Sequence, residues 1–459
     1  MSCRPPETEE IDAATFVVGD RERDQKSELP LNYRTVFLSN AAWMLVGNLA
    51  SGLGQWAQLM VLAKIGTIEM VGSFALSLAI CLPVLMFSSL GLRVLQVTDT
   101  KRGHRLLEYT ALRIITLCGS VLIILAIELA SGGRGEALIS TLFVAGAKCI
   151  EYVSDILYGS LQQREQMAGI GISMMLRAAL GVVALPLAVY LTHSLVWGTF
   201  GLLVSSIFVL LGYDIQKSLR ASSFSFRQVW NATDEYIRNV GRSDGYRRLW
   251  KLAVAGTPMG VVLMLVSLNV NIPRYFIQEH LGTRDLAIFS AIATLLTAGS
   301  VVTNAMGQAA APRVATSFSD RDWRMFGFMV GSLIAVSLGL GVLGFMGAFL
   351  FGKQAMQVLY RPEYATRQDV LLWLMGTSGV LYLGSTLGYA LTAVRCLKPQ
   401  VPLFAVAVIA TAISCIILVP SRGLVGVAMA ILLSAVVQCL GNAGLLWNAC
   451  KKSIASAAV

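Results

Sequence analysis

The sequence predicts an all-α polytopic membrane protein whose transmembrane helices form two similar halves. Its 459 residues are 56% hydrophobic and only 14% charged, whereas soluble proteins carry about 25% charged residues. The mean hydropathy is +0.68. Long apolar runs recur along the whole chain, separated by short polar connections. These features exclude an ordinary soluble domain.

Twelve of these runs are long enough to span a bilayer, whose core of about 30 Å requires roughly 20 apolar residues in a helix. The expected spans are 36–64, 70–92, 110–129, 137–161, 168–191, 195–213, 250–276, 286–309, 325–350, 368–394, 400–420 and 424–449. Most Lys and Arg fall in every second connection, which places those connections and both termini in the cytoplasm. The net charge of +10 therefore reflects membrane orientation and indicates no nucleic-acid partner.

The longest connection divides the chain into two halves of six spans each. The expected segments are a polar cytoplasmic tail (1–33), an N-terminal six-helix bundle (34–213), a basic cytoplasmic loop (214–249), a C-terminal six-helix bundle (250–450) and a second cytoplasmic tail (451–459). The fourth spans of the two halves end alike, in "DILYGSLQQR" and "TLGYALTAVR". This similarity predicts a 6+6 parallel repeat.

No catalytic or metal-binding motif stands out in the sequence. It lacks HExxH, GxxxxGK[ST] and GxGxxG, and its eight cysteines form no CxxC pair. The extracytoplasmic connections are also too short for the catalytic loop of a glycosyltransferase or polysaccharide polymerase. We therefore expect a transporter with neither a cofactor nor a metal ion.

The stretch "FVAGAKCIEYVSDILYGSLQQRE", from Phe143 to Glu165, covers most of the fourth span and contains Lys148, Glu151 and Asp155 on one helical face. Arg177 lies at a similar depth in the fifth span. Each ionised group facing lipid at mid-depth costs about 2.5–3.5 kcal/mol, so this stripe should face the bundle interior. Two interpretations remain open: the cations pair with Glu151 and Asp155 as structural contacts, or they form the floor of a cavity. In the second case Glu151 and Asp155 are the candidates for ion coupling.

Milder polar stripes follow the first, seventh and eighth spans at helical spacing. They comprise Asn48, Ser51, Gln55 and Gln58; Ser267, Asn271 and Arg274; and Thr297, Ser300, Asn304 and Gln308. Hydrogen bonds between helices would explain each stripe singly, while a shared cavity would explain all three. The candidate substrate-binding residues are therefore Lys148, Arg177, Arg274, Asn48, Gln55, Gln58, Asn271 and Asn304.

Several short motifs in the chain together resemble the motifs of a known family. They are "KCIEYVSDILYGSLQQRE", "NIPRYFI", "HLGTRDLAIFSAIATL", "VLYRPEYA" and "GLVGVAMAILLS". The chain resembles lipid-linked oligosaccharide flippases of the O-antigen and exopolysaccharide type, in the superfamily of multidrug, oligosaccharidyl-lipid and polysaccharide exporters. The tenth span departs from the expected pattern, because its stretch "VLLWLMGTSGVLYLGSTLGYALTAV" has no charge before Arg395.

The resemblance implies a V-shaped pair of bundles around a central cationic cavity in a bacterial inner-membrane protein. It also implies transfer of an undecaprenyl-pyrophosphate-linked oligosaccharide to the periplasmic leaflet. Polysaccharide polymerase and chain-length proteins would be partners in that pathway. Lys148, Arg177 and Arg274 would bind the pyrophosphate, for which the forked guanidinium is well shaped. A cation-coupled drug antiporter, a peptidoglycan-precursor flippase and a polymerase or ligase of the same pathway are the alternatives.

Overall fold

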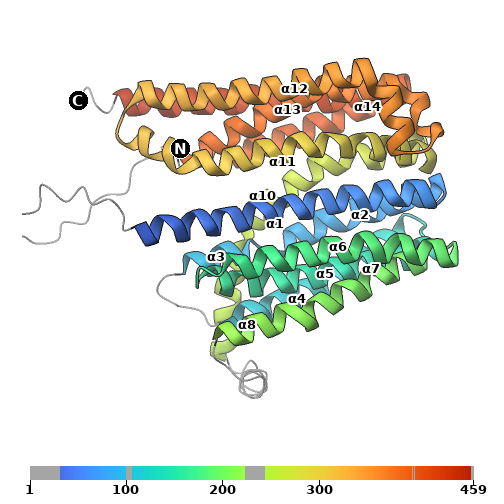
Figure 1. Cartoon of the computed structure of the whole chain (residues 1–459), viewed down its shortest axis with the longest axis horizontal. Coiled ribbons are helices and arrows are strands. Elements are labelled where there is room, and N and C mark those ends of the chain that lie inside the picture. The colour runs from blue at the N-terminus through green and yellow to red at the C-terminus, as the bar shows by residue number, and fades with distance from the viewer. Residues whose placement is uncertain (1–30, 100–105, 223–242, 395, 397–398, 456–459) are drawn as a thin grey trace, which may run out of the picture.

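Long helices make up the computed structural model, which describes residues 31–99, 106–222, 243–394, 396 and 399–455 (Figure 1). There is no strand within these ranges. The first helices are α1 (Leu31–Ile65), α2 (Ile68–Ser88), α3 (Leu92–Thr98), α4 (Leu106–Ala130), α5 (Glu136–Gln162), α6 (Met167–Thr192) and α7 (Leu195–Val209). A π-helical turn η1 (Leu210–Asp214) and α8 (Ile215–Ser222) follow directly.

The remaining helices begin after the region between 223 and 242, which lies outside the described residues. They are α10 (Ser243–His280), α11 (Thr283–Ser319), α12 (Trp323–Leu359), the 3-10 turn η2 (Pro362–Arg367), α13 (Gln368–Ala393) and α14 (Gln400–Ala455). Most of the expected loop 214–249 and nearly all of the expected tail 1–33 also lie outside the described residues. The segment 451–455 continues α14.

Ten helices in the described part of the chain are long and apolar enough to cross a membrane. α14 contains two helices joined at a kink, where Gly423 has a φ of 56°. This kink falls between the expected spans 400–420 and 424–449. α1 is 35 residues long but is not among the ten, since it carries the polar stripe described above. The multi-pass helical architecture is confirmed, while the count of twelve spans and their 6+6 repeat stay predictions.

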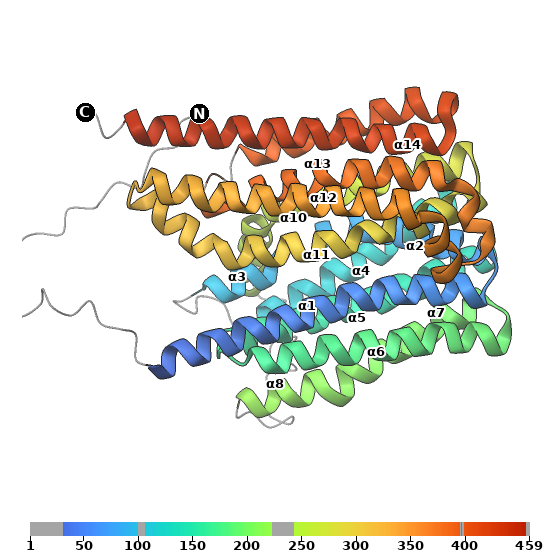
Figure 2. The same ribbon diagram turned by 45° about the horizontal axis from the view of Figure 1, so that its top comes forward.

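The helices lie in two groups, with α1 to α8 in one part of Figure 1 and α11 to α14 in the other. α10 packs against both α2 and α14 and so connects the groups. α1 and α11 diverge toward the end of the molecule where α1 begins (Figure 2). The space between the groups therefore widens toward that end.

The two groups meet at the opposite end, which we call the closed end. There the Arg361 guanidinium donates hydrogen bonds to the Lys64 carbonyl oxygen over 2.9 and 3.2 Å. Gly72 at the start of α2 lies so close to Thr283 that any β-carbon would collide with the Thr283 carbonyl oxygen. Tyr275 on α10 also donates to the Ala79 carbonyl oxygen on α2. These contacts join the groups by backbone acceptors as well as by packing.

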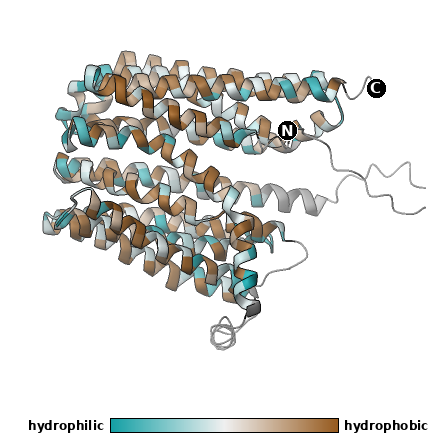
Figure 3. Cartoon of the chain, turned by 180° about the vertical axis from the view of Figure 1, so that it is seen from behind, coloured by the Kyte–Doolittle hydropathy of each residue, from teal (hydrophilic) through white to brown (hydrophobic). Residues whose placement is uncertain are grey.

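The outer faces of the helices are apolar. Large hydrophobic side chains such as Leu122, Leu343 and Trp447 are exposed there, and apolar residues dominate the visible helices in Figure 3. Exposed apolar surface of this extent is typical of contact with lipid. The polar side chains that the sequence places within spans must then be accommodated between helices.

Candidate functional site

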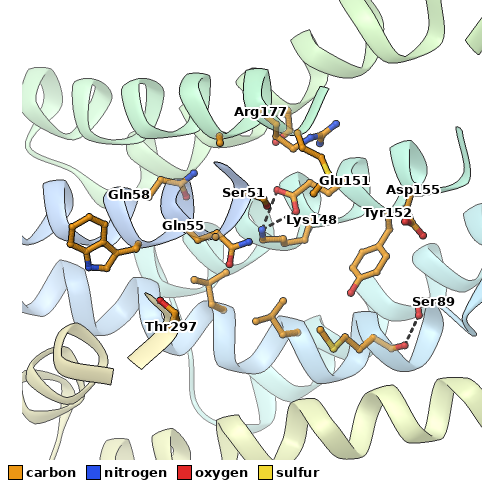
Figure 4. Close-up of a pocket in the computed structure, with 18 of the residues that line it drawn as sticks. Ser51, Gln55, Gln58, Ser89, Lys148, Glu151, Tyr152, Asp155, Arg177 and Thr297 are labelled. Atoms are coloured by element: carbon orange, nitrogen blue, oxygen red, sulfur yellow. Dashed lines mark hydrogen bonds and ion pairs between the residues drawn. The ribbon is translucent and has the colours of Figure 1, made fainter. Parts of the chain in front are cut away.

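A cavity of about 770 Å³ lies between the two groups of helices. Its lining comes from α1, α2, α3, α4, α5, α6, α7, α10 and α11. Figure 4 shows its polar residues, with Gln58 toward one end, Lys148 and Glu151 in the middle, and Asp155 and Ser89 toward the other. Of the eight expected substrate-binding residues, Lys148, Arg177, Arg274, Gln55 and Gln58 line this cavity.

Lys148 and Glu151 form an ion pair along one face of α5. The Lys148 ammonium donates to both carboxylate oxygens of Glu151, over 3.1 and 2.9 Å. Their helical spacing of three residues favours this contact. Both side chains line the cavity, so the structural and cavity interpretations of this pair hold together.

Arg177 pairs with a residue that the sequence interpretation placed in a loop. Its Nη2 donates to Asp214 Oδ2 over 2.9 Å and to Ser154 Oγ over 2.7 Å. The expectation that Arg177 pairs with Glu151 or Asp155 is therefore wrong. The helix continues past residue 213 through η1, and this turn carries Asp214 inward, where its side chain is only 1% exposed.

Asp214 is the centre of a buried polar network. Besides Arg177, it accepts hydrogen bonds from the hydroxyls of Ser154 and Ser173. Ser173 in turn contacts the hydroxyl of Tyr158 over 2.5 Å. Hydrogen bonds of this kind compensate the desolvation of a buried carboxylate. The network holds Arg177 at the cavity wall with its Nη1 buried and unpartnered.

Asp155 contacts two arginines that the site prediction omitted. Its Oδ1 lies 3.2 Å from Arg93 Nη1 and its Oδ2 lies 3.4 Å from Arg113 Nη2. Both arginines line the cavity. Arg113 is visible in the sequence as a lone cation in the third span, the pattern that commonly marks a functional residue in a membrane. Arg93 gave no such signal, because it follows the second span among other basic residues.

Arg274 is a cavity-lining cation with no carboxylate partner in the part of the chain that the structure describes. Its Nη1 donates to the Asn271 side-chain oxygen over 2.5 Å, and its Nε is buried without a partner. Asn271 itself is buried and donates to Ser267. The polar residues on α10 therefore orient the Arg274 guanidinium, whose charge no carboxylate in the described residues neutralises.

Amides and hydroxyls from α1 and α11 also line the cavity. They are Ser51, Gln55, Gln58, Ser290, Thr294, Thr297 and Ser300. Asn48, Asn271 and Asn304 do not line the cavity: Asn48 is exposed, and Asn271 accepts a hydrogen bond from Arg274. The lining thus includes three residues of the α1 stripe, two of the α11 stripe and only Arg274 of the α10 stripe.

The cavity therefore combines an excess of cations with neutral polar groups. Arg93, Arg113, Lys148, Arg177 and Arg274 outnumber the carboxylates Glu151, Asp155 and Asp214 that pair with them. Such a surface favours an anionic group beside a group rich in hydroxyls.

The fold of the described residues is shared with solved structures of membrane transporters. One solved structure with the same fold is an inward-facing multidrug resistance MATE family transporter of the MOP superfamily, with a TM-score of 0.70 and 16% identity, covering 90% of this chain and 99% of that chain. Another is the lipid II flippase MurJ in an inward closed conformation, with a TM-score of 0.63 and 11% identity, covering 92% and 90%.

The chain belongs to the polysaccharide biosynthesis protein family, whose model matches residues 37–318. It is 25% identical over 399 residues to the capsular polysaccharide biosynthesis protein CapF of Staphylococcus aureus, covering 86% of this chain and 96% of CapF. The protein is thus a multi-pass helical membrane protein of the polysaccharide biosynthesis family. This confirms the resemblance recognised in the motifs.

Proposed function

We propose that the protein moves an undecaprenyl-pyrophosphate-linked oligosaccharide from the cytoplasmic to the periplasmic leaflet of the bacterial inner membrane. Both termini would lie in the cytoplasm, and the cavity would open toward that side. The closed end, with Arg361 and Gly72, would then face the periplasm. The halves would rock between this state and its opposite while the lipid tail stays in the bilayer.

The observation that carries this proposal is the unpaired guanidinium of Arg274 in a cavity that also holds Lys148 and Arg177. We call these three residues the deep site. A buried cation without a counter-charge is costly, and a pyrophosphate would supply the missing charge. Gln55, Gln58 and several hydroxyl groups in the same cavity would supply donors and acceptors for a glycan.

The charge of the cavity also argues against the antiporter alternative. A carrier of cationic drugs would require an excess of carboxylates, whereas cations are in excess here. Glu151 and Asp155 remain the candidates for ion coupling, because both line the cavity, and we add Asp214, which pairs with Arg177, as a third candidate. A peptidoglycan-precursor flippase would use the same deep site. Only the substrate therefore distinguishes this alternative from the proposed function.

The test reconstitutes the purified protein into liposomes that contain labelled undecaprenyl-pyrophosphate-linked oligosaccharide. An impermeant glycosidase then reports transfer between leaflets. We expect Arg274→Ala, Lys148→Ala and Arg177→Ala each to reduce transfer at least tenfold, because a charge-assisted hydrogen bond contributes about 1.5–3 kcal/mol. Arg284→Ala is the matched control, since Arg284 is an exposed cation outside the cavity.

Full transfer by all three deep-site variants would refute the site assignment. Transfer of lipid II but of no other lipid-linked glycan would favour the peptidoglycan-precursor alternative. Failure with every lipid-linked sugar, together with proton-coupled efflux of a cationic dye, would favour the antiporter.

A further inference from the structure

A second cationic cluster lies apart from the deep site, toward the end of the cavity where Asp155 and Ser89 lie in Figure 4. We call Arg93, Arg113, Tyr152 and Asp155 the mouth site. Asp155 bridges the two guanidinium groups, over 3.2 Å to Arg93 and 3.4 Å to Arg113. Two cations here share one carboxylate, so the cluster keeps an excess positive charge.

The two arginines are held in place by more than this carboxylate. The Arg113 guanidinium lies over the Tyr152 ring, 5.5 Å from its centroid. The Arg93 guanidinium lies 5.7 Å from the centroid of the Tyr158 ring, and its Nε donates to Gln162 over 3.1 Å. Stacking on aromatic rings fixes a guanidinium plane without using its N–H donors. The guanidinium groups of Arg93 and Arg113 are therefore held in fixed orientations before any ligand binds.

Arg113 has hydrogen-bonding capacity that the fold leaves unused. Its side chain is only 1% exposed, yet its Nε and Nη1 have no hydrogen-bond partner. A buried donor without an acceptor costs about 1–3 kcal/mol, and here several belong to one cation. An anion with more oxygens than a carboxylate would satisfy them.

The mouth site lies within about two helical turns of the deep site. Asp155 and Lys148 are seven residues apart on α5, which corresponds to about 10 Å along the helix, and Arg177 contacts Ser154, the residue before Asp155. A phosphoryl group bound at one site would therefore have the other within a short distance.

We propose that the mouth site is a second phosphoryl-binding site, at which Asp155 occupies the position of the ligand until a phosphoryl group displaces it. This inference rests on the proposed function: the pyrophosphate of the lipid carrier binds first between Arg93 and Arg113 and then passes to the deep site. Asp155 is suited to exchange, because its side chain is 30% exposed and lines the cavity. No covalent bond is made or broken in this step.

The test measures binding of inorganic pyrophosphate to the purified full-length protein in detergent, by thermal shift over a range of ligand concentrations. Lys148→Ala/Arg274→Ala serves as the parent, so that only Arg177, which stays paired with Asp214, remains of the deep site. We expect Asp155→Asn in this parent to bind pyrophosphate about tenfold more tightly, because the competing carboxylate charge is gone. Arg93→Gln should weaken binding by about the same factor.

Unchanged or weaker binding by Asp155→Asn would overturn the proposal, as would undiminished binding by Arg93→Gln. The second variant tests the proposal even if the first one fails to fold, since the loss of Arg93 leaves Asp155 paired with Arg113. Glycerol phosphate, a soluble analogue of a phospholipid headgroup, is the second probe. Equal binding of this probe would assign the site to bulk phospholipid and overturn its role for the carrier.

The liposome assay separates this inference from the proposed function. Tighter pyrophosphate binding by Asp155→Asn without transfer of any lipid-linked sugar would support the mouth site and refute the proposed function. Transfer of the sugar with no change in pyrophosphate affinity would support the proposed function and overturn the mouth site.

Discussion

The buried pair of Arg177 and Asp214 provides the most direct test of the electrostatic reasoning. Asp214→Asn keeps the shape of the side chain but leaves Arg177 without a counter-charge in a region where Asp214 is 1% exposed. Removing one partner of a buried ion pair typically costs 3–5 kcal/mol. We expect Asp214→Asn to lower the free energy of unfolding by about 3 kcal/mol or more.

The assay is equilibrium unfolding of the purified protein in mixed micelles with increasing sodium dodecyl sulfate. The matched control is Asp369→Asn, because Asp369 pairs with Arg367 at an exposed position and such pairs contribute about 0–1 kcal/mol. Arg177→Gln/Asp214→Asn should recover most of the loss, since it removes both charges. The reasoning is refuted if Asp214→Asn costs no more than the control, or if the losses of the two single variants simply add.

Three further predictions concern the closed end, the helix packing and the glycan wall. Arg361→Ala removes the hydrogen bonds to α1, so a thiol reagent added from that end should label a cysteine introduced into the cavity by Ser51→Cys, whereas Arg367→Ala should have no such effect. Gly54→Val should destabilise the protein by about 1–3 kcal/mol, because an added Cβ would lie 2.6 Å from a side chain of α6; Gly119→Val, with open space around it, is the control. Gln55→Leu should weaken binding of the lipid-linked glycan several-fold without changing the affinity for pyrophosphate. Equal labelling in Arg361→Ala and Arg367→Ala would contradict the first expectation, and equal destabilisation by Gly54→Val and Gly119→Val the second. Equal losses of affinity for the glycan and for pyrophosphate in Gln55→Leu would contradict the third.

Most of the fold follows from local patterns in the sequence. The expected spans coincide with the helices to within a few residues in α5 and α6, because a run of apolar residues can satisfy its backbone in lipid only as a helix. The break at Gly423 also falls where the last two spans were separated. The end of the sixth span was misjudged, since the polar residues after 213 indicated a loop while the helix continues through a π-turn into α8.

The candidate site was predictable only in part. The stripe of Lys148, Glu151 and Asp155 and the neighbouring Arg177 were visible, because charge within an apolar run is costly and must face the interior. Their partners were not visible: Asp214 pairs with Arg177 across 37 residues and Arg93 with Asp155 across 62. Helical spacing shows which residues share a face of one helix. It does not show which other helix that face contacts.

The sequence by itself determined that this chain is a helical membrane protein of the polysaccharide biosynthesis family with ionisable groups inside its spans. It did so because lipid tolerates few backbone structures and few charges, and both constraints act locally. Only the tertiary structure decided which cavity cation lacks a carboxylate partner, which carboxylate bridges two arginines, and which asparagines lie away from the cavity. Those properties depend on distances between helices, which packing sets and no single helix contains.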